Sequence, residues 1–167
     1  MEMSATAIRL VKQIQRLCIE RGLTVAAAES LTTGRVQALL GSQSGSSGFF
    51  VGGVCTYNIA MKNRILKVPI GVAKPVNCVS PDVAVAMADH VRRLFDASLG
   101  VATTGYAEPA PEHGYPNPGA FIAVSDGARP TAVSNYISIP VADIIATRAD
   151  VQQYIAERTL DLVLSCL

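Results

Sequence analysis

Residues 24–35 decide the fold, and they run Thr24-Val25-Ala26-Ala27-Ala28-Glu29-Ser30-Leu31-Thr32-Thr33-Gly34-Arg35. The apolar run at 24–28 predicts a strand, and the periodic apolar residues that follow the turn predict a helix at about 32–40. In an open α/β sheet, ligands bind where such a strand ends beside a helix N-terminus. Backbone N–H groups that are unpaired at a helix N-terminus also favour anions.

Ser30 occupies the bend between this strand and this helix. A serine at that place can be a nucleophile, a hydrogen-bond donor to a phosphate, or a helix cap. From spacing alone the cap is favoured, because Ser and Thr are preferred N-cap residues.

The composition predicts one soluble domain spanning residues 1–167. Half of the residues are hydrophobic, and 14 basic side chains nearly balance 13 acidic ones, so no overall charge attracts nucleic acid or an anionic membrane surface. No apolar run reaches membrane-spanning length. The charged residues within 1–22 leave no room for a signal-peptide core. We therefore expect a cytoplasmic protein that has neither a nucleic-acid partner nor a membrane partner.

The four cysteines, Cys18, Cys55, Cys78 and Cys166, are widely spaced and form no Cys-x-x-Cys pair. A structural zinc site needs short paired spacings, so we expect neither a metal nor a disulfide. Cys18 lies in a helical pattern and Cys55 in an apolar strand. Both are expected to be small buried hydrophobic residues.

The rest of the chain alternates between helical and strand patterns, which predicts a three-layer α/β/α sandwich with a mixed sheet. Ser80-Pro81 is a typical helix start, with an N-cap followed by proline at the first helical position. Gly52-Gly53 suggests a bulge or a close backbone approach in a buried strand. The expected elements are a first helix ending at Gly22, a loop at 41–48, a strand at 49–57, a helix at 59–66, a helix at 80–95, a strand at 99–104, a strand pair at 119–125 and 131–139, and a final helix at about 143–166.

Polar residues follow the ends of the predicted strands, and Lys62 comes one helical turn after Asn58. Attack on an amide requires a nucleophile and a proton acceptor, which Ser30 and Lys62 can supply with help from Tyr57. The alternatives are that Lys62 is solvated on a short helix and that Tyr57 is a core residue with its hydroxyl at the surface. The residues alone leave both possibilities open.

The order and spacing of several short motifs resemble the C-terminal domain of the competence/damage-inducible CinA proteins. That family includes stand-alone nicotinamide mononucleotide deamidases, and the resemblance covers nearly the whole chain. The motifs are Glu29-Ser30 with Thr32 and Gly34, Gly45-Ser46-Ser47, Gly52-Gly53-Val54, Thr56-Tyr57, Lys62, Val79-Ser80, Met87-Ala88, Thr104-Gly105, Pro118-Gly119 and Arg148.

This resemblance implies hydrolysis of a nicotinamide carboxamide with release of ammonia, in a homo-oligomer without a metal or organic cofactor. It implies that Ser30 is the nucleophile, Lys62 its base and Tyr57 a residue that orients or relays a proton. It also implies that Arg148 pairs with the phosphate of a small-molecule substrate, since a guanidinium binds phosphate in a bidentate manner. The remaining residues expected to bind substrate are Thr32, Thr33, Gly34, Ser46, Ser47, Asn58, Thr104 and Gly105.

The chain departs from the family pattern after Gly105. A glycine-rich stretch is expected there, but residues 106–114 read Tyr-Ala-Glu-Pro-Ala-Pro-Glu-His-Gly. Side chains and prolines restrict the approach of a ligand to the backbone, and Glu108 and Glu112 repel a phosphate unless a cation neutralises them. Thr33 replaces a common glycine, and Gln152 and Gln153 stand where further arginines are common.

Two classes of function therefore stay open. One is an amidohydrolase acting on nicotinamide mononucleotide or a related pyridine amide, favoured by Ser30, Tyr57, Lys62 and Arg148. The other is a catalytically weak or inactive paralogue that binds a ligand or supports an assembly, favoured by the altered 106–114 segment.

Overall fold

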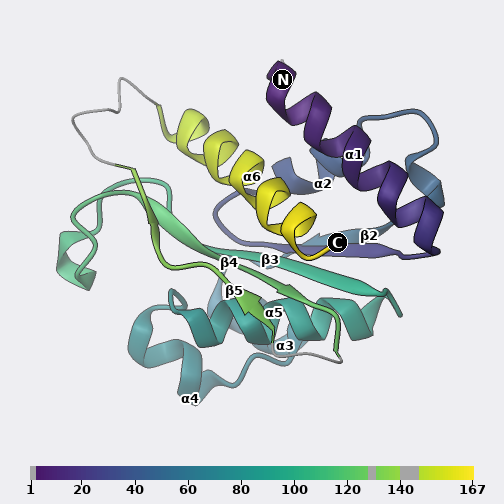
Figure 1. Ribbon diagram of the computed structural model, residues 1–167. Coiled ribbons are helices and arrows are strands. Elements are labelled where there is room, and N and C mark those ends of the chain that lie inside the picture. Colours follow the sequence, from purple (N-terminus) through teal and green to yellow (C-terminus); the bar gives the residue numbers. More distant parts are fainter. Residues whose placement is uncertain (1–2, 128–130, 140–146) are drawn as a thin grey trace.

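The computed structural model describes residues 3–127, 131–139 and 147–167 (Figure 1). Its helices lie on both sides of one sheet. In chain order the elements are α1 (Ala5–Arg21), β1 (Val25–Glu29), α2 (Arg35–Leu40), β2 (Phe50–Cys55), α3 (Ile59–Leu66), α4 (Ile70–Ala73), α5 (Pro81–Leu94), β3 (Leu99–Tyr106), β4 (Gly119–Ser125), β5 (Ala132–Val133), β6 (Ile137–Ser138) and α6 (Arg148–Ser165), with 3-10 turns at Ser46–Gly48, Lys74–Val76 and Pro111–His113.

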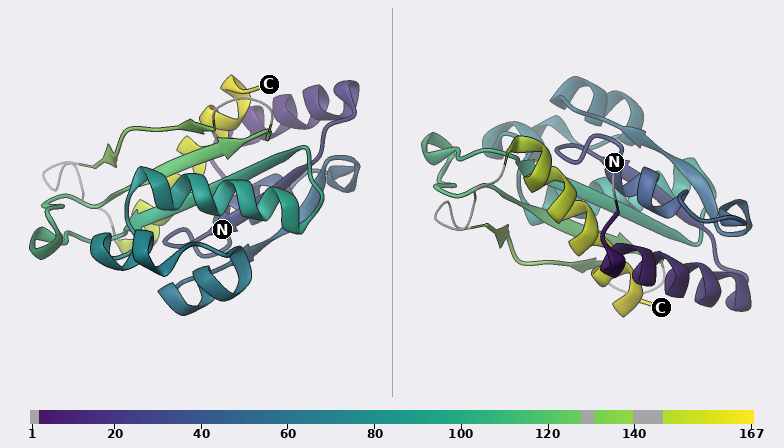
Figure 2. Two further views of the ribbon diagram at one scale, coloured as in Figure 1. Left: turned by 90° about the horizontal axis from the view of Figure 1, so that it is seen from below. Right: turned by 90° about the horizontal axis from the view of Figure 1, so that it is seen from above.

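The sheet is mixed, and its strands follow the order β2-β1-β3-β4-β5, with β6 also paired to β4. β1 runs parallel to both β2 and β3, while β4 runs antiparallel to β3. In Figure 1, α1, α2 and α6 cover one face of the sheet, and α3, α4 and α5 cover the other. Figure 2 shows α5 crossing one face, with α1 and α6 on the opposite face. The predicted three-layer α/β/α sandwich is confirmed.

Both faces of the central strands are buried, which explains why β1 and β3 are nearly continuous apolar runs. One core cluster packs α1, α2 and α6 against the sheet and includes Ile14, Phe49 and Leu160. The other packs α5 against the opposite face and includes Met87. Ser80 caps α5 by accepting a hydrogen bond from the Val83 N–H, as the Ser80-Pro81 signal predicts.

The second strand differs from its prediction, because β2 is a partly exposed edge strand rather than a buried one. Its register against β1 shifts by one residue near Val51, so the predicted bulge is present. A Cβ atom on Gly53 would lie 2.4 Å from the Ala27 carbonyl oxygen. The close backbone approach expected at Gly52-Gly53 is therefore present as well.

Other boundaries also moved. The second helix begins at Arg35 and not at position 32, because Thr33 and Gly34 have positive φ angles of 49° and 96°. The strand expected at 131–139 consists of two short pieces, β5 and β6. The expected start of the final helix, at 143–146, lies outside the described residues.

All four cysteines are free thiols. Cys18 is buried as expected, whereas Cys55 is exposed, since it ends the edge strand β2. Across the described ranges, no helix has the length and apolar character needed to cross a membrane.

Candidate active site

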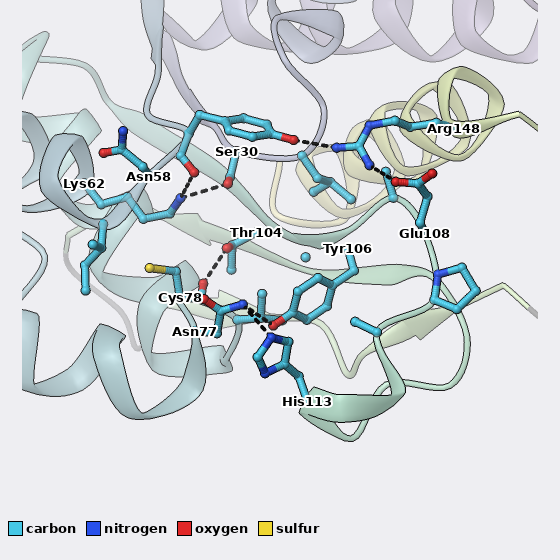
Figure 3. Close-up of a pocket in the computed structure, with 18 of the residues that line it drawn as sticks. Ser30, Asn58, Lys62, Asn77, Cys78, Thr104, Tyr106, Glu108, His113 and Arg148 are labelled. Atoms are coloured by element: carbon cyan, nitrogen blue, oxygen red, sulfur yellow. Dashed lines mark hydrogen bonds and ion pairs between the residues drawn. The ribbon is translucent and has the colours of Figure 1, made fainter.

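A pocket of about 590 Å³ opens where the carboxyl ends of β1, β2 and β3 meet (Figure 3). Its wall is completed by the start of α3, by the 106–114 segment between β3 and β4, and by Arg148 at the start of α6. This volume lies within the range of small-molecule sites. The position also agrees with the rule that ligands bind beyond the carboxyl ends of the strands in an open α/β sheet.

Ser30 and Lys62 meet inside this pocket. The Lys62 ammonium donates a 2.8 Å hydrogen bond to Ser30 Oγ. Asn58 caps α3 by accepting a hydrogen bond from the Met61 N–H. This cap fixes where α3 begins, and Lys62, one turn later, then points into the pocket. The Lys62 side chain is only 1% exposed. Of the two sequence-based alternatives for Lys62, the solvated side chain is therefore wrong.

Burial lowers the pKa of Lys62 to about 8, with a smaller opposing effect from Cys78. Lys62 Nζ also donates to the carbonyl oxygens of Thr56, at 2.8 Å, and Tyr57, at 3.3 Å. A neutral amine has two N–H groups and one lone pair. If the two carbonyls accept the two N–H groups, the lone pair is directed at Ser30, whose hydroxyl then donates to Lys62. The geometry therefore suits removal of the Ser30 proton.

Tyr57 contacts Lys62 through its backbone carbonyl and not through its ring. Its side chain is 55% exposed, and the hydroxyl accepts a hydrogen bond from Arg148 Nη2 at 2.5 Å. The second Arg148 amino group, Nη1, lies 2.5 Å from Glu108 Oε2 and forms an ion pair with it. Figure 3 shows Arg148 and Glu108 together at one side of the pocket.

Three side chains form a second polar cluster at the other side of the pocket. Asn77 Nδ2 lies 3.0 Å from the Tyr106 hydroxyl and 3.1 Å from His113 Nε2. The Tyr106 and His113 rings are stacked, with centroids 5.6 Å apart and an angle of 9° between their planes. The Tyr115 ring packs against Tyr106 in a tilted arrangement, with the ring centroids 5.4 Å apart. The altered 106–114 segment is thus an ordered wall of the pocket.

Glu29 determines how the turn after β1 is built. Its buried carboxylate accepts hydrogen bonds from the N–H groups of Gly34, Val36 and Gln37 at 2.9 to 3.2 Å, and from the Gln37 side-chain amide. The prediction that Ser30 caps the helix is wrong: Gly34 is the N-cap, and the carboxylate of Glu29 supplies the missing acceptors. The helix N-terminus is consequently not free to bind an anion.

Seven of the twelve expected site residues line the pocket, and five do not. The first group comprises Ser30, Tyr57, Asn58, Lys62, Thr104, Gly105 and Arg148. Thr32 is buried and shares a hydrogen bond with Thr103, and the Thr33 hydroxyl accepts one from Arg35. Gly34 binds Glu29 through its N–H group.

The loop at Ser46 and Ser47 lies at the opposite end of the sheet. Ser46 and Ser47 precede β2, whose first residue Phe50 pairs with Val25 at the start of β1, whereas Ser30 follows its last residue. Parallel strands place their starts at the edge opposite to their ends. The structure therefore does not bring these two serines to the pocket of this chain.

Sequence reasoning missed the structural role of Glu29 and the contribution of Asn77, Tyr106 and His113. A carboxylate that follows an apolar strand directly and precedes a helix is a signal that could have indicated Glu29. Asn77 and His113 carry no such signal, because they are 36 positions apart in the sequence and meet only in the folded chain. Among the described residues, no group of three or more His, Cys, Asp or Glu side chains is placed to hold a metal ion.

Comparison with solved structures shows the same fold. The competence/damage inducible protein of Agrobacterium tumefaciens superposes with a TM-score of 0.87 at 23% identity, covering 99% of this chain and 98% of that one. A CinA superfamily protein from Enterobacter cloacae gives a TM-score of 0.87 at 23% identity, covering 99% and 95%. Similarity at this level of identity concerns the fold alone.

Sequence comparison gives the family. A relative named competence-damage inducible protein, from Desulforamulus reducens, is 39% identical over 75% of this chain and 30% of its own length. Another of that name, from Streptococcus agalactiae, is 35% identical over 92% of this chain and 35% of its own length. The chain thus spans about a third of the length of these curated relatives. The family model described as the CinA C-terminal domain matches residues 7–167, and this chain belongs to that family.

Proposed function

We propose that this chain is an amidohydrolase that cleaves the carboxamide of a nicotinamide nucleotide or a related pyridine amide. One observation carries the proposal: the buried Lys62 amine lies 2.8 Å from the Ser30 hydroxyl at the base of a ligand-sized pocket. A lowered amine pKa and a hydroxyl within hydrogen-bond reach are what a serine–lysine mechanism requires.

In the first half of the reaction, Ser30 Oγ attacks the carboxamide carbon while its proton passes to neutral Lys62. The tetrahedral intermediate collapses when its C–N bond breaks. The Lys62 ammonium returns the proton to the leaving nitrogen, so ammonia departs and an ester joins the acyl group to Ser30.

In the second half, water attacks that ester and gives its proton to Lys62. The C–O bond to Ser30 breaks, and the proton returns from Lys62 to Ser30 Oγ. The net reaction consumes one amide and one water, and it yields one carboxylic acid and one ammonia, which exchange a proton in solution. No electrons are transferred, and no co-reactant besides water is needed.

Tyr57 and Arg148 act at the rim of the pocket. Arg148 Nη2 donates a 2.5 Å hydrogen bond to the Tyr57 hydroxyl. The backbone carbonyl of Tyr57 accepts a hydrogen bond from Lys62. Tyr57 thereby connects the rim to the base without its hydroxyl reaching the Ser30–Lys62 pair. Oligomer assembly, which the resemblance implies, stays a prediction.

The second candidate function is ligand binding without turnover. The Arg148–Glu108 ion pair favours this candidate, because Arg148 is the residue that the resemblance assigns to the substrate phosphate and Glu108 already binds it. Ammonia release separates the two candidates. Purified protein is incubated with nicotinamide mononucleotide, nicotinamide riboside and free nicotinamide, with a Ser30→Ala variant in parallel. Release that requires Ser30 supports hydrolysis, whereas binding of any of these compounds without ammonia release supports the second candidate.

A further inference from the structure

The charged side chains in the pocket leave no uncompensated cation at its rim. Among the described residues that line the pocket, the charged side chains are Lys62, Glu108, Glu112 and Arg148. Arg148 is paired with Glu108, and Lys62 is buried at the base against three oxygen acceptors. Glu112 adds a further negative charge. A phosphate dianion would therefore meet two carboxylates and one guanidinium that is already paired.

His113 is hydrogen-bonded to Asn77 at this wall of the pocket. An amide nitrogen can only donate hydrogen bonds, so the 3.1 Å contact between Asn77 Nδ2 and His113 Nε2 makes Nε2 the acceptor. Glu112 Oε1 lies 3.9 Å from His113 Nε2, so the carboxylate stands beside this ring.

Two helix N-termini near the pocket carry a carboxylate of this chain, whereas the neutral amide of Asn58 caps α3. Glu29 accepts the N–H groups at the start of α2. At the start of α6, the Asp150 carboxylate accepts from the Thr147 N–H while the Thr147 hydroxyl accepts from the Asp150 N–H. These hydrogen bonds lower the pKa of Asp150, which keeps it charged. Helix N-termini are common phosphate sites, and a carboxylate at the start of α2 and of α6 disfavours a second anion there.

Five of the nine positions in the 106–114 segment have no free backbone donor. Pro109 and Pro111 have no N–H group. The N–H groups of Ala110, His113 and Gly114 all donate to carbonyl oxygens within residues 110–115. A loop binds phosphate by pointing successive N–H groups at it. In this segment, these three N–H groups are already hydrogen-bonded within the loop's own turn.

The same segment presents features that suit a flat, electron-poor ring. Tyr106 lines the pocket, and Figure 3 shows it together with His113 apart from the Ser30–Lys62 pair. His113 stacks on one face of the Tyr106 ring, which leaves the other face as the one to receive a ligand. The face of a tyrosine ring attracts a cation within about 6 Å of its centroid. Glu112 adds a carboxylate to this part of the wall.

From these contacts we propose that the pocket selects a cationic pyridinium carboxamide without a phosphate, that is, a nucleoside in preference to a nucleotide. The inference rests on the proposed function for the fate of the amide, but its charge argument concerns binding alone. The Glu108–Arg148 ion pair is the element that excludes the phosphorylated form, because it holds the rim guanidinium away from an incoming anion.

Binding to the Ser30→Ala variant tests this preference without turnover. Calorimetric titration compares nicotinamide riboside with nicotinamide mononucleotide at low ionic strength. We expect the riboside to bind at least about tenfold more tightly, with a smaller difference at high salt, where charge repulsion is screened. Equal or tighter binding of the mononucleotide, or no binding of the riboside, overturns the inference.

A second variant assigns the effect to Glu108. Glu108→Gln keeps the shape but frees Arg148, so mononucleotide affinity should rise about tenfold while riboside affinity stays level or falls. Glu20→Gln removes the same charge from an exposed ion pair on α1 and is the matched control. If the ratio of riboside affinity to mononucleotide affinity is the same in Glu108→Gln as in Glu20→Gln, then Glu108 does not exclude phosphate and the inference is wrong.

Ammonia assays with the wild-type protein keep this inference separate from the proposed function. Riboside preference in binding with no ammonia from either compound would refute hydrolysis and leave the inference standing. Ammonia release with a higher kcat/KM for the mononucleotide would support hydrolysis and refute the inference.

Discussion

The Lys62 amine donates a 2.8 Å hydrogen bond to the Ser30 hydroxyl, although the two residues are 32 positions apart and lie on different elements. Each is nearly inaccessible, with 1% of Lys62 and 7% of Ser30 exposed. A buried ammonium is costly, so its retention beside a serine at the base of a pocket points to chemistry and not to stability.

Ser30→Ala should remove nearly all ammonia release. The change deletes one oxygen at the end of β1, so the protein should remain folded by circular dichroism and thermal melting. Ser165→Ala is the matched control, because Ser165 is exposed at the end of α6 and does not line the pocket. Turnover in Ser30→Ala at the rate of this control would eliminate Ser30 as the nucleophile.

The pH dependence of kcat/KM should report the neutral form of Lys62. Burial lowers the pKa of this amine to about 8, so activity should rise with pH and level off above that value. Lys62→Arg retains a charge but has no accessible neutral form, and it should be nearly inactive. An active Lys62→Arg enzyme, or a profile without an acid limb, would show that Lys62 is not the base.

The same lowered pKa predicts a change in stability with pH. Because the folded protein holds the Lys62 proton less tightly than the unfolded chain does, the free energy of unfolding should rise between about pH 8 and pH 10.5. The full rise is about 3 kcal/mol, since one pKa unit corresponds to about 1.4 kcal/mol. Urea denaturation of the wild type and of Lys62→Met across this pH range gives the free energy of unfolding of each protein. The difference between the two free energies should grow with pH by this amount. A constant difference would mean that the folded-state pKa is not lowered.

Tyr57→Phe should weaken substrate binding more than it slows the chemical step. The variant loses the hydroxyl that accepts from Arg148, but it keeps the carbonyl that accepts from Lys62. We therefore expect a higher KM, a similar kcat and an unchanged midpoint of the acid limb. A large loss of kcat at unchanged KM would indicate that the hydroxyl takes part in proton transfer.

Glu29→Gln should destabilise the protein by about 1.5–3 kcal/mol, the typical value of a hydrogen bond to a charged group. The neutral amide cannot accept from three backbone N–H groups at the start of α2 as a carboxylate does. Denaturant titration at pH 7 measures the loss, with the exposed Glu20→Gln on α1 as control. Equal stability of the two variants would contradict this role for Glu29.

The sequence predicts local structure well wherever the signal is local. The Ser80-Pro81 start of α5, the helix at 59–66 and the strand at 119–125 follow from residues within one turn or one strand. The motif order also points to the family, and the family model confirms it. Ser30, Lys62 and Arg148 are named from that order, and all three line one pocket.

The errors concern positions whose surroundings come from distant parts of the chain. Cys55 looks like a core residue from its neighbours, but β2 is the edge of the sheet, so the residue is exposed. Ser46 and Ser47 follow the motif order, yet the parallel pairing of β1 and β2 places them at the other end of the sheet.

The sequence alone determined the alternation of helices and strands, the mixed α/β/α architecture and the residues that mark the family, because these depend on periodicity, caps and motif order. Only the tertiary structure decided that Lys62 is buried on Ser30, that Glu29 fills the α2 N-terminus and that Glu108 pairs with Arg148 across 40 positions. Burial and charge pairing are properties of a place in space, which strand order and register set, and no local pattern in the chain encodes them.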